Sequence, residues 1–181
     1  MVERLYTSAS SLGWEGVSPG DRTAQYAIWL EDPEIGGVLQ QYMTIDRARV
    51  WLKDGPMKEY ARARMGVGKY SALVRTGRAE PAALVRQALG EGWELVPGTT
   101  GIKPLHATAA RGDERVNIFW GPVKDFKHLL WAALEAMDDP GAPPATVIVI
   151  ETLAQPATTA EKHRQTRFAQ RCGFSLAHIR I

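Results

Sequence analysis

Apolar and aromatic residues occur in short runs along the N-terminal third of the chain, with alternation in ARVWLK at 48–53, and this pattern predicts a β-rich segment. The three runs are AQYAIWL, VLQQYMTI and ARVWLK. The residues between them include Gly, Pro and polar residues, which favour turns over sheet ladders. The preceding residues 1–22 are turn-rich, and we expect them to form an arm that packs through Tyr6 and Trp14. The predicted strands cover residues 24–30, 38–45 and 48–53.

Helical spacing and capping signals replace this alternation in the rest of the chain. Pro56 and Pro81 suit the first turn of a helix, and Thr158 with Glu161 forms a capping-box pattern whose helix ends at Gly173. The β-branched run ATVIVIETL is typical of a strand covered on both faces, and RGDE joins two alternating runs as a hairpin. Helices are predicted at 56–64, 81–89, 122–137 and 159–172, and strands at 93–96, 105–110, 115–120, 145–153 and 174–181.

The order of these elements predicts an α+β fold. It has an antiparallel sheet with packed helices, a central α-β-β-β-α unit over residues 81–137 and a C-terminal β-α-β segment. Two domain organisations agree with this order. Either a β-rich N-terminal subdomain over residues 1–79 precedes an α+β subdomain over residues 80–181, or the whole chain forms one compact domain.

Composition narrows the class of protein. The chain has 181 residues, of which 45% are hydrophobic, and six Trp, so it can bury a sizeable core. It has no run of 18 apolar residues, which argues against a transmembrane helix, and its N-terminus has no secretory signal pattern. The single cysteine, Cys172, excludes an internal disulfide. We therefore expect a cytoplasmic protein that needs no cofactor, and the four histidines show no metal-ligand spacing.

Charge is unevenly distributed although the net charge is only +2. Residues 58–88 hold seven basic and two acidic residues, and residues 140–181 hold five and two. If the two basic segments converge in the fold, they form a surface that attracts a polyanion such as RNA or DNA. The candidate contacts are Arg62, Arg64, Lys69, Tyr70, Arg75 and Arg78 in the first segment and Arg164, Arg167 and Arg171 in the second.

The Arg, Lys and Tyr residues of the two basic segments suit contacts with phosphates and bases. The competing interpretation is that both segments are ordinary solvent-exposed surface. Arginine and lysine neutralise phosphates, and tyrosines such as Tyr60 and Tyr70 can stack on bases. Arg164, Arg167 and Arg171 are three and four residues apart, so they share one face of the predicted helix. Phe168 and Cys172 are predicted to mark its buried side.

Known nucleotide-binding motifs do not account for GVGKYS at residues 66–71. A P-loop needs a glycine where Ala63 stands and Ser or Thr where Tyr70 stands, and a dinucleotide fingerprint needs a third glycine in place of Ser71. This stretch is therefore interpreted as a candidate polyanion contact rather than as a nucleotide-binding loop.

Two residues are candidates for catalysis. His106 lies in a predicted strand beside a glycine-containing loop, where it can act as a general base if a partner orients it. Glu151 ends the buried run VIVI, and strand ends open into crevices in which chemistry often occurs. A metal-dependent nuclease motif needs a lysine where Leu153 stands, so Glu151 is equally interpreted as a capping or exposed carboxylate.

Residues 81–137 resemble the HicA toxin domain, which has a double-stranded-RNA-binding-like fold. The similarity rests on the Gly92-Trp93 pair before a strand and on the KDFK turn at residues 124–127 before a helix. The family carries its catalytic histidine directly beside a glycine, whereas here His106 follows Gly101 by five residues. The resemblance thus implies an RNA-binding fold without the family's catalytic histidine in place.

Three classes of function follow from these observations. The first is a nucleic-acid-binding protein without catalysis, which contacts phosphates through the two basic segments. The second is a protein-interaction module of the antitoxin, immunity or adaptor type, because Trp residues and alternating charge suit such an interface. The third is a small hydrolase or nuclease that uses His106 and Glu151. Oligomeric state cannot be inferred from the sequence.

Overall fold

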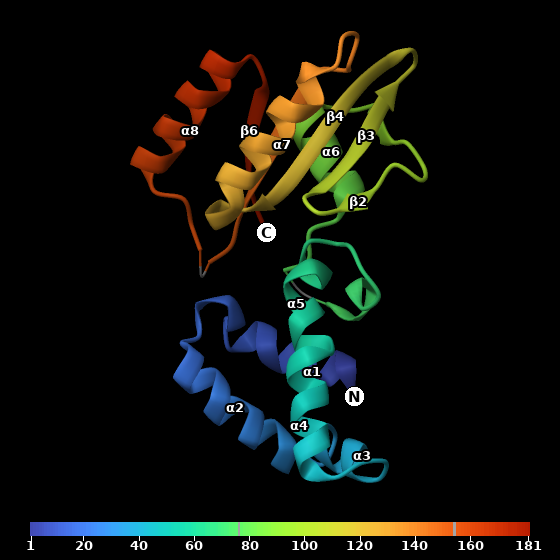
Figure 1. Ribbon diagram of the computed structural model, residues 1–181, viewed down its shortest axis with the longest axis vertical. Coiled ribbons are helices and arrows are strands. Elements are labelled where there is room, and N and C mark those ends of the chain that lie inside the picture. The colour runs from blue at the N-terminus through green and yellow to red at the C-terminus, as the bar shows by residue number, and fades with distance from the viewer. Residues whose placement is uncertain (76, 154) are drawn as a thin grey trace. The chain divides into compact units, whose positions relative to one another are not determined.

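The computed structural model describes residues 1–75, 77–153 and 155–181, and the chain divides into two compact units (Figure 1). Unit 1 comprises Met1–Arg78 and unit 2 comprises Ala79–Ile181. In the parts of the chain that the structure describes, no helix has both the length and the hydrophobicity that crossing a membrane requires.

Unit 1 is helical, so the prediction of a β-rich N-terminal subdomain is wrong. The helix expected at 56–64 is confirmed, whereas the three predicted strands and the predicted arm are helices or turns. The helices are α1 (Val2–Ser11), α2 (Pro19–Glu31), α3 (Gly36–Gln40), α4 (Ile45–Asp54) and α5 (Pro56–Arg64), with short 3-10 helices η1 (Trp14–Gly16) and η2 (Ser71–Leu73).

The spacing of the buried side chains explains why these segments are helices and not strands. In α2, Tyr26, Trp29 and Leu30 are buried at positions i, i+3 and i+4, and in α4 Ala48 and Leu52 are buried four residues apart. Helix α2 also begins at an N-cap, since the Ser18 side chain accepts a hydrogen bond from the Asp21 amide and Pro19 occupies the first turn. Short runs that were interpreted as strands thus bury their apolar residues with a period of 3.6.

Aromatic side chains form the core of unit 1. Trp14, Tyr26 and Trp29 are in mutual contact, with ring centroids 4.9 to 5.7 Å apart. Tyr6 and Tyr60 meet edge to face at 5.1 Å, and the Tyr6 hydroxyl donates to the Pro56 carbonyl at 2.7 Å. Tyr6 and Trp14 are therefore buried as expected, although from helices rather than from an extended arm.

Unit 2 contains one mixed sheet, which confirms the α+β class and corrects the purely antiparallel arrangement. The strand order is β1-β3-β4-β5-β6, and β2 also pairs with β3. Pairs β1–β3, β2–β3 and β3–β4 are antiparallel, whereas β4–β5 and β5–β6 are parallel. The strands are β1 (Glu94–Leu95), β2 (Gly101–Ile102), β3 (Leu105–Arg111), β4 (Glu114–Pro122), β5 (Ala145–Glu151) and β6 (Ser175–Arg180).

Parallel pairing arises because a helix connects each of these strands to the next. Helix α7 (Phe126–Asp138) joins β4 to β5, and α8 (Thr159–Cys172) joins β5 to β6. Both helices pack on one face of the sheet, whereas α6 (Pro81–Leu89) lies against the other face (Figure 1). Every residue of β5 is buried, as predicted for a strand covered on both faces.

The carboxyl ends of β4 and β5 lie at the same edge of the sheet, where α7 and α8 begin. A short 3-10 helix, η3 (Val123–Asp125), leads from β4 into α7. The predicted capping box at the start of α8 is present, with Thr158 and Glu161 in reciprocal hydrogen bonds. This edge is where open sheets with helical crossovers most often bind ligands.

Candidate nucleic-acid interface

The basic segment of unit 1 contains a buried arginine. Arg64 is 8% exposed, and its guanidinium lies 2.8 Å from the Glu15 carboxylate. It also donates from Nε and Nη2 to the Gly77 carbonyl, at 3.0 and 2.8 Å. Its three guanidinium nitrogens therefore all donate inside unit 1, where they connect α5 to η1 and to the chain after η2.

The neighbouring arginines of this segment also contact unit 1 itself. Arg62 pairs with Glu59 at 2.9 Å, and Arg75 pairs with Glu3 at 2.6 Å. Arg78 donates to the Ser71 carbonyl at 2.9 Å. The exposed Lys69 lies 5.2 Å from the ring centre of Tyr70, which in turn packs against Tyr6, and Tyr60 is buried. Most of the predicted contacts in this segment thus have intramolecular partners.

The arginines of α8 are placed differently. Arg164, Arg167 and Arg171 are exposed, and none of them forms an ion pair among the described residues. The buried side of α8 is formed by Gln165 and Ala169. Phe168, predicted on that buried side, is instead 41% exposed.

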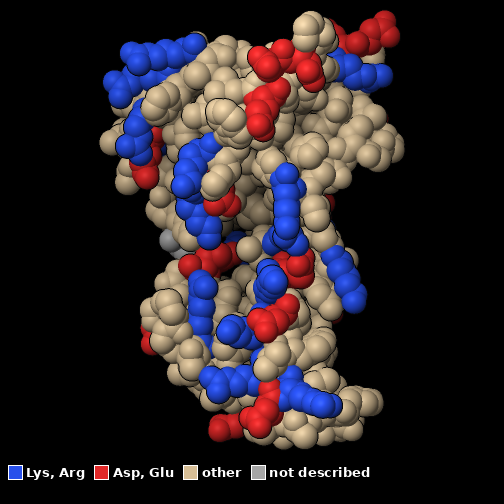
Figure 2. Space-filling view, viewed as in Figure 1, with Lys and Arg blue, Asp and Glu red and all other residues tan. Residues whose placement is uncertain are grey.

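Helix α7 presents similar side chains on the neighbouring surface. Lys127 and Trp131 are four residues apart, so they lie on one face of α7, and Trp131 is 63% exposed. On α8, Arg164, Phe168 and Arg171 follow the same helical stripe. Figure 2 shows Lys and Arg side chains over α8 and around the start of α7. We use the name α7–α8 groove for the exposed surface of these neighbouring segments, and define it by Lys124 of η3, Lys127 and Trp131 of α7, and Arg164, Arg167, Phe168 and Arg171 of α8.

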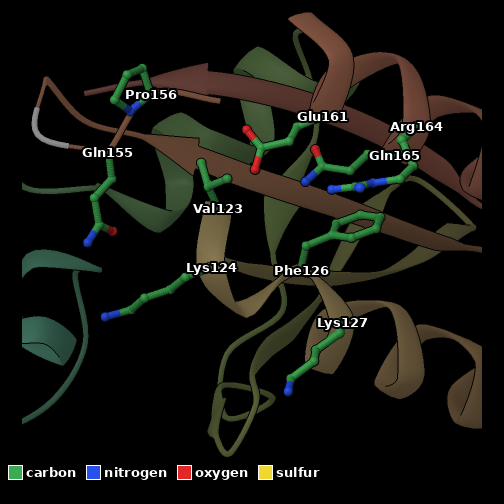
Figure 3. A pocket seen from close by; sticks show the side chains of 9 residues that line it. All are labelled: Val123, Lys124, Phe126, Lys127, Gln155, Pro156, Glu161, Arg164 and Gln165. Carbon is green, nitrogen blue, oxygen red and sulfur yellow. The ribbon is translucent and has the colours of Figure 1, made fainter. Parts of the chain in front are cut away.

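A pocket lies at the beginning of this groove, between the N-terminal ends of α7 and α8 (Figure 3). Its volume is about 560 Å³, which falls in the range of small-molecule sites. Phe126 and Val123 line one side, and Gln155 and Pro156, which follow β5, line another. Lys124, Lys127, Glu161, Arg164 and Gln165 supply its polar groups. We call it the Gln165 pocket.

Positive charge predominates in the Gln165 pocket. No ion pair involves Lys124, Lys127 or Arg164 in the described parts of the chain. The one carboxylate, that of Glu161, accepts hydrogen bonds from the Thr158 amide and hydroxyl, both at 2.8 Å. These bonds, first the one from the backbone amide, lower the pKa of Glu161, which therefore stays ionised. Three cations and one carboxylate leave a net charge of +2.

Gln165 is the buried polar residue of this pocket. Gln165 is 4% exposed, and the oxygen of its side-chain amide has no hydrogen-bond partner among the described residues. An unpaired buried amide group costs about 1 to 3 kcal/mol. Ala or Met would form the same helix without this cost, so packing alone does not explain a glutamine at this position.

His106 and Glu151 do not lie together. His106 pairs with Phe119, which pairs with Val147, four residues before Glu151. Two strand spacings and four residues along the strand separate their backbones by roughly 16 Å. His106 Nδ1 lies 2.8 Å from the Pro104 carbonyl oxygen, and its ring covers Gly101 so closely that a side chain there would collide with it. A hydrolase site that uses both residues is therefore not formed.

Glu151 has an electrostatic role at the end of β5. Its carboxylate lies 2.6 Å from Lys162 Nζ and 3.4 Å from His178 Nδ1, and accepts a hydrogen bond from the Ala157 amide at 3.3 Å. Burial raises the pKa of Glu151, but the Lys162 ammonium and the Ala157 amide outweigh this effect and hold the pKa below its ordinary value. Among the described residues, no group of three or more His, Cys, Asp and Glu is arranged to bind a metal ion.

Acid is expected to destabilise the cluster of Glu151, Lys162 and His178 in two successive pH ranges. Burial lowers the pKa of His178, so the unfolded chain binds a proton there more readily and stability falls as the pH drops below about 6.5. The groups that face His178 are Glu151 on β5 and Lys162 on α8, with Arg180 farther along β6. Glu151, whose folded pKa is depressed, stabilises the fold above its ordinary pKa of 4.5, and this contribution is lost as the pH falls further.

Chemical denaturation between pH 7.5 and 5.5 measures the first step. We expect the free energy of unfolding to fall with pH in the wild type, and to fall less in His178→Gln, which has no proton to gain. His163→Gln, at an exposed position on α8, is the matched control and should keep the wild-type slope. Equal slopes in all three proteins would contradict a role for His178 in acid sensitivity.

The sequence pointed to the α8 arginines as candidate contacts, but not to Lys124, Lys127, Trp131 and Phe168 of the same surface. One signal was present, because Lys127 and Trp131 are spaced four apart, as are Arg164 and Phe168. The sequence did not indicate that α7 and α8 lie side by side on one face of the sheet. No sequence pattern around Gln165 indicated that it lines a pocket.

Comparisons with protein-family models, with curated proteins and with solved structures find no significant match to this chain. The resemblance of residues 81–137 to the HicA toxin domain therefore stays a prediction. The class of the protein rests on its fold and its site: an α+β chain whose second unit presents exposed cations and aromatic side chains beside a pocket.

Proposed function

We propose that this protein binds nucleic acid through the α7–α8 groove of unit 2. The observation that supports this most directly is the combination of five cations without ion-pair partners among the described residues, on η3, α7 and α8, with two exposed aromatic side chains on α7 and α8. The predicted contribution of residues 58–78 is not retained, because most of their guanidinium groups have partners inside unit 1.

Each kind of side chain in the groove matches one part of a nucleic-acid strand. Lys and Arg neutralise phosphates and release counterions, which supplies most of the affinity in non-specific binding. Trp131 and Phe168 offer exposed ring faces, and stacking of an unpaired base on such a ring contributes about 1 to 3 kcal/mol. Because stacking needs bases that are not paired, the groove suits a single strand better than a duplex.

Salt dependence of binding tests this proposal. If Lys124, Lys127, Arg164, Arg167 and Arg171 each contact a phosphate, the slope of log K against log salt is about −3.5 for a single strand. Affinity should then fall roughly a hundredfold between about 50 and 200 mM salt. The measurement is fluorescence anisotropy with labelled single- and double-stranded RNA and DNA. Absence of binding at the lower salt to all of these probes would overturn the proposal.

A protein partner is the second candidate, supported by the apolar surface of unit 1. Ile28, Tyr42, Ile45 and Val50 are all exposed, and Tyr42 reaches 80% exposure. Helices α2, α3 and α4, on or beside which these residues lie, pack against one another. Exposed apolar side chains mark an interaction site where they form a contiguous patch. If no nucleic acid binds, this surface becomes the leading candidate for the function of the chain.

A further inference from the structure

We propose that the Gln165 pocket binds the phosphorylated end of a nucleic-acid strand, that is, a terminal nucleotide carrying a phosphate monoester. This inference rests on the proposed function and adds a specificity to it. The pocket opens at the beginning of the α7–α8 groove, so a strand that follows the groove can end there.

The charge of the pocket matches a monoester better than a diester. Lys124, Lys127 and Arg164 with Glu161 leave a net charge of +2. An internal phosphodiester carries a single negative charge, whereas a terminal phosphate carries about −1.5 to −2 at neutral pH and has three acceptor oxygens. The N-terminal ends of α7 and α8 also direct partial positive charge toward the same region.

Gln165 is an independent observation that points to a ligand. Figure 3 shows its side chain extending between the side chains of Glu161 and Phe126 within the pocket. Its amide oxygen is buried without a partner, and rotation about the terminal torsion, which is broad for an amide, exchanges the oxygen and the nitrogen. Gln165 can therefore pair with a sugar hydroxyl or a base edge, which a simple anion does not have.

Phe126 and the pocket volume complete the match to a nucleotide. Phe126 lines the wall beside the Lys and Arg side chains, so a base can lie against its ring while the phosphate meets the cations. The volume of about 560 Å³ accommodates a nucleotide and is far larger than a phosphate ion needs. The chemistry of the pocket thus indicates a nucleoside phosphate as the ligand.

The test compares three single-stranded oligonucleotides of the same sequence by anisotropy: one with a 5′-phosphate, one with a 3′-phosphate and one with hydroxyl groups at both ends. We expect at least one phosphorylated strand to bind about tenfold more tightly than the unphosphorylated one, because hydrogen bonds to charged groups are the stronger kind. Equal affinity of all three strands would overturn the inference, while the salt dependence of their common binding would still test the proposed function separately.

Gln165→Met tests the role of the amide. Met is unbranched and forms helix well, so the variant loses the unpaired oxygen and should unfold at the same or a higher temperature than the wild type. We expect it to bind the preferred strand several-fold more weakly, whereas Gln170→Met, at an exposed position on α8, should leave binding unchanged. Full retention of affinity in Gln165→Met would overturn the role of Gln165. Lys124→Ala, a surface change, provides a second variant that does not depend on core packing, and an undiminished preference for the terminal phosphate in it would contradict the pocket.

Discussion

Reversing three charges of the α7–α8 groove, with Lys127, Arg164 and Arg171 all changed to Glu, is expected to weaken nucleic-acid binding by at least about a hundredfold at low salt. Three of the five proposed phosphate contacts are lost, and three carboxylates are placed where phosphates would lie. The slope of log K against log salt should shrink from about −3.5 to about −1.4, because only two contacts remain. Fluorescence anisotropy across a salt series measures both changes.

A control of equal charge change is available in unit 1. Arg47, Arg49 and Lys53 are exposed on α4, and their replacement by Glu alters the net charge by the same amount. We expect this control to bind with nearly the wild-type salt slope, since its cations lie outside the groove. An equal loss in both variants would mean that binding responds to overall charge alone. Retained binding in the groove variant, with an unchanged circular dichroism spectrum, would contradict the proposed interface.

Arg64→Met is expected to lower the free energy of unfolding of unit 1 by about 3 to 5 kcal/mol. The change leaves the Glu15 carboxylate, whose side chain is only 12% exposed, without its cation, and it removes two hydrogen bonds from the Gly77 carbonyl. Leaving a buried charge unpaired is among the most destabilising consequences of a single substitution. Hydrogen exchange is the suitable measurement, because it reports amides of residues 1–78 separately from those of unit 2.

The neighbouring Arg62→Met is the matched control for this prediction. Arg62 pairs with Glu59 on the same helix, and both side chains are about one-third exposed, so we expect a loss of no more than about 1 kcal/mol. Changing Glu15 to Leu together with Arg64→Met should recover much of the lost stability, because no charge then remains buried. If Arg64→Met instead left unit 1 stable and weakened nucleic-acid binding, Arg64 would belong to the interface after all.

Local sequence signals were sufficient for the longer elements of unit 2, although the short strand β2 was predicted as loop. The capping box of Thr158 and Glu161, the glycine at position 173 and the β-branched run of β5 act within a few residues of chain, so they could be predicted without knowledge of the rest. The same kind of reasoning failed in unit 1. The short apolar run AQYAIWL fits a buried strand as well as a helix, and only packing of Tyr26, Trp29 and Leu30 into one core selects the helix.

The sequence by itself determined the α+β class, the helices and longer strands of unit 2 and the presence of three arginines on one helix, but not the short strand β2 at Gly101–Ile102. Only the tertiary structure decided which cations have partners. Glu15 precedes Arg64 by 49 residues and Glu3 precedes Arg75 by 72, so pairings that depend on the whole fold cannot be seen in a local pattern. The α7–α8 groove also depends on the whole fold. Helices α7 and α8 lie side by side because β4, β5 and β6 pair in parallel. This pairing brings Lys127 and Arg164 to one pocket with Gln165, whose amide oxygen has no partner among the described residues.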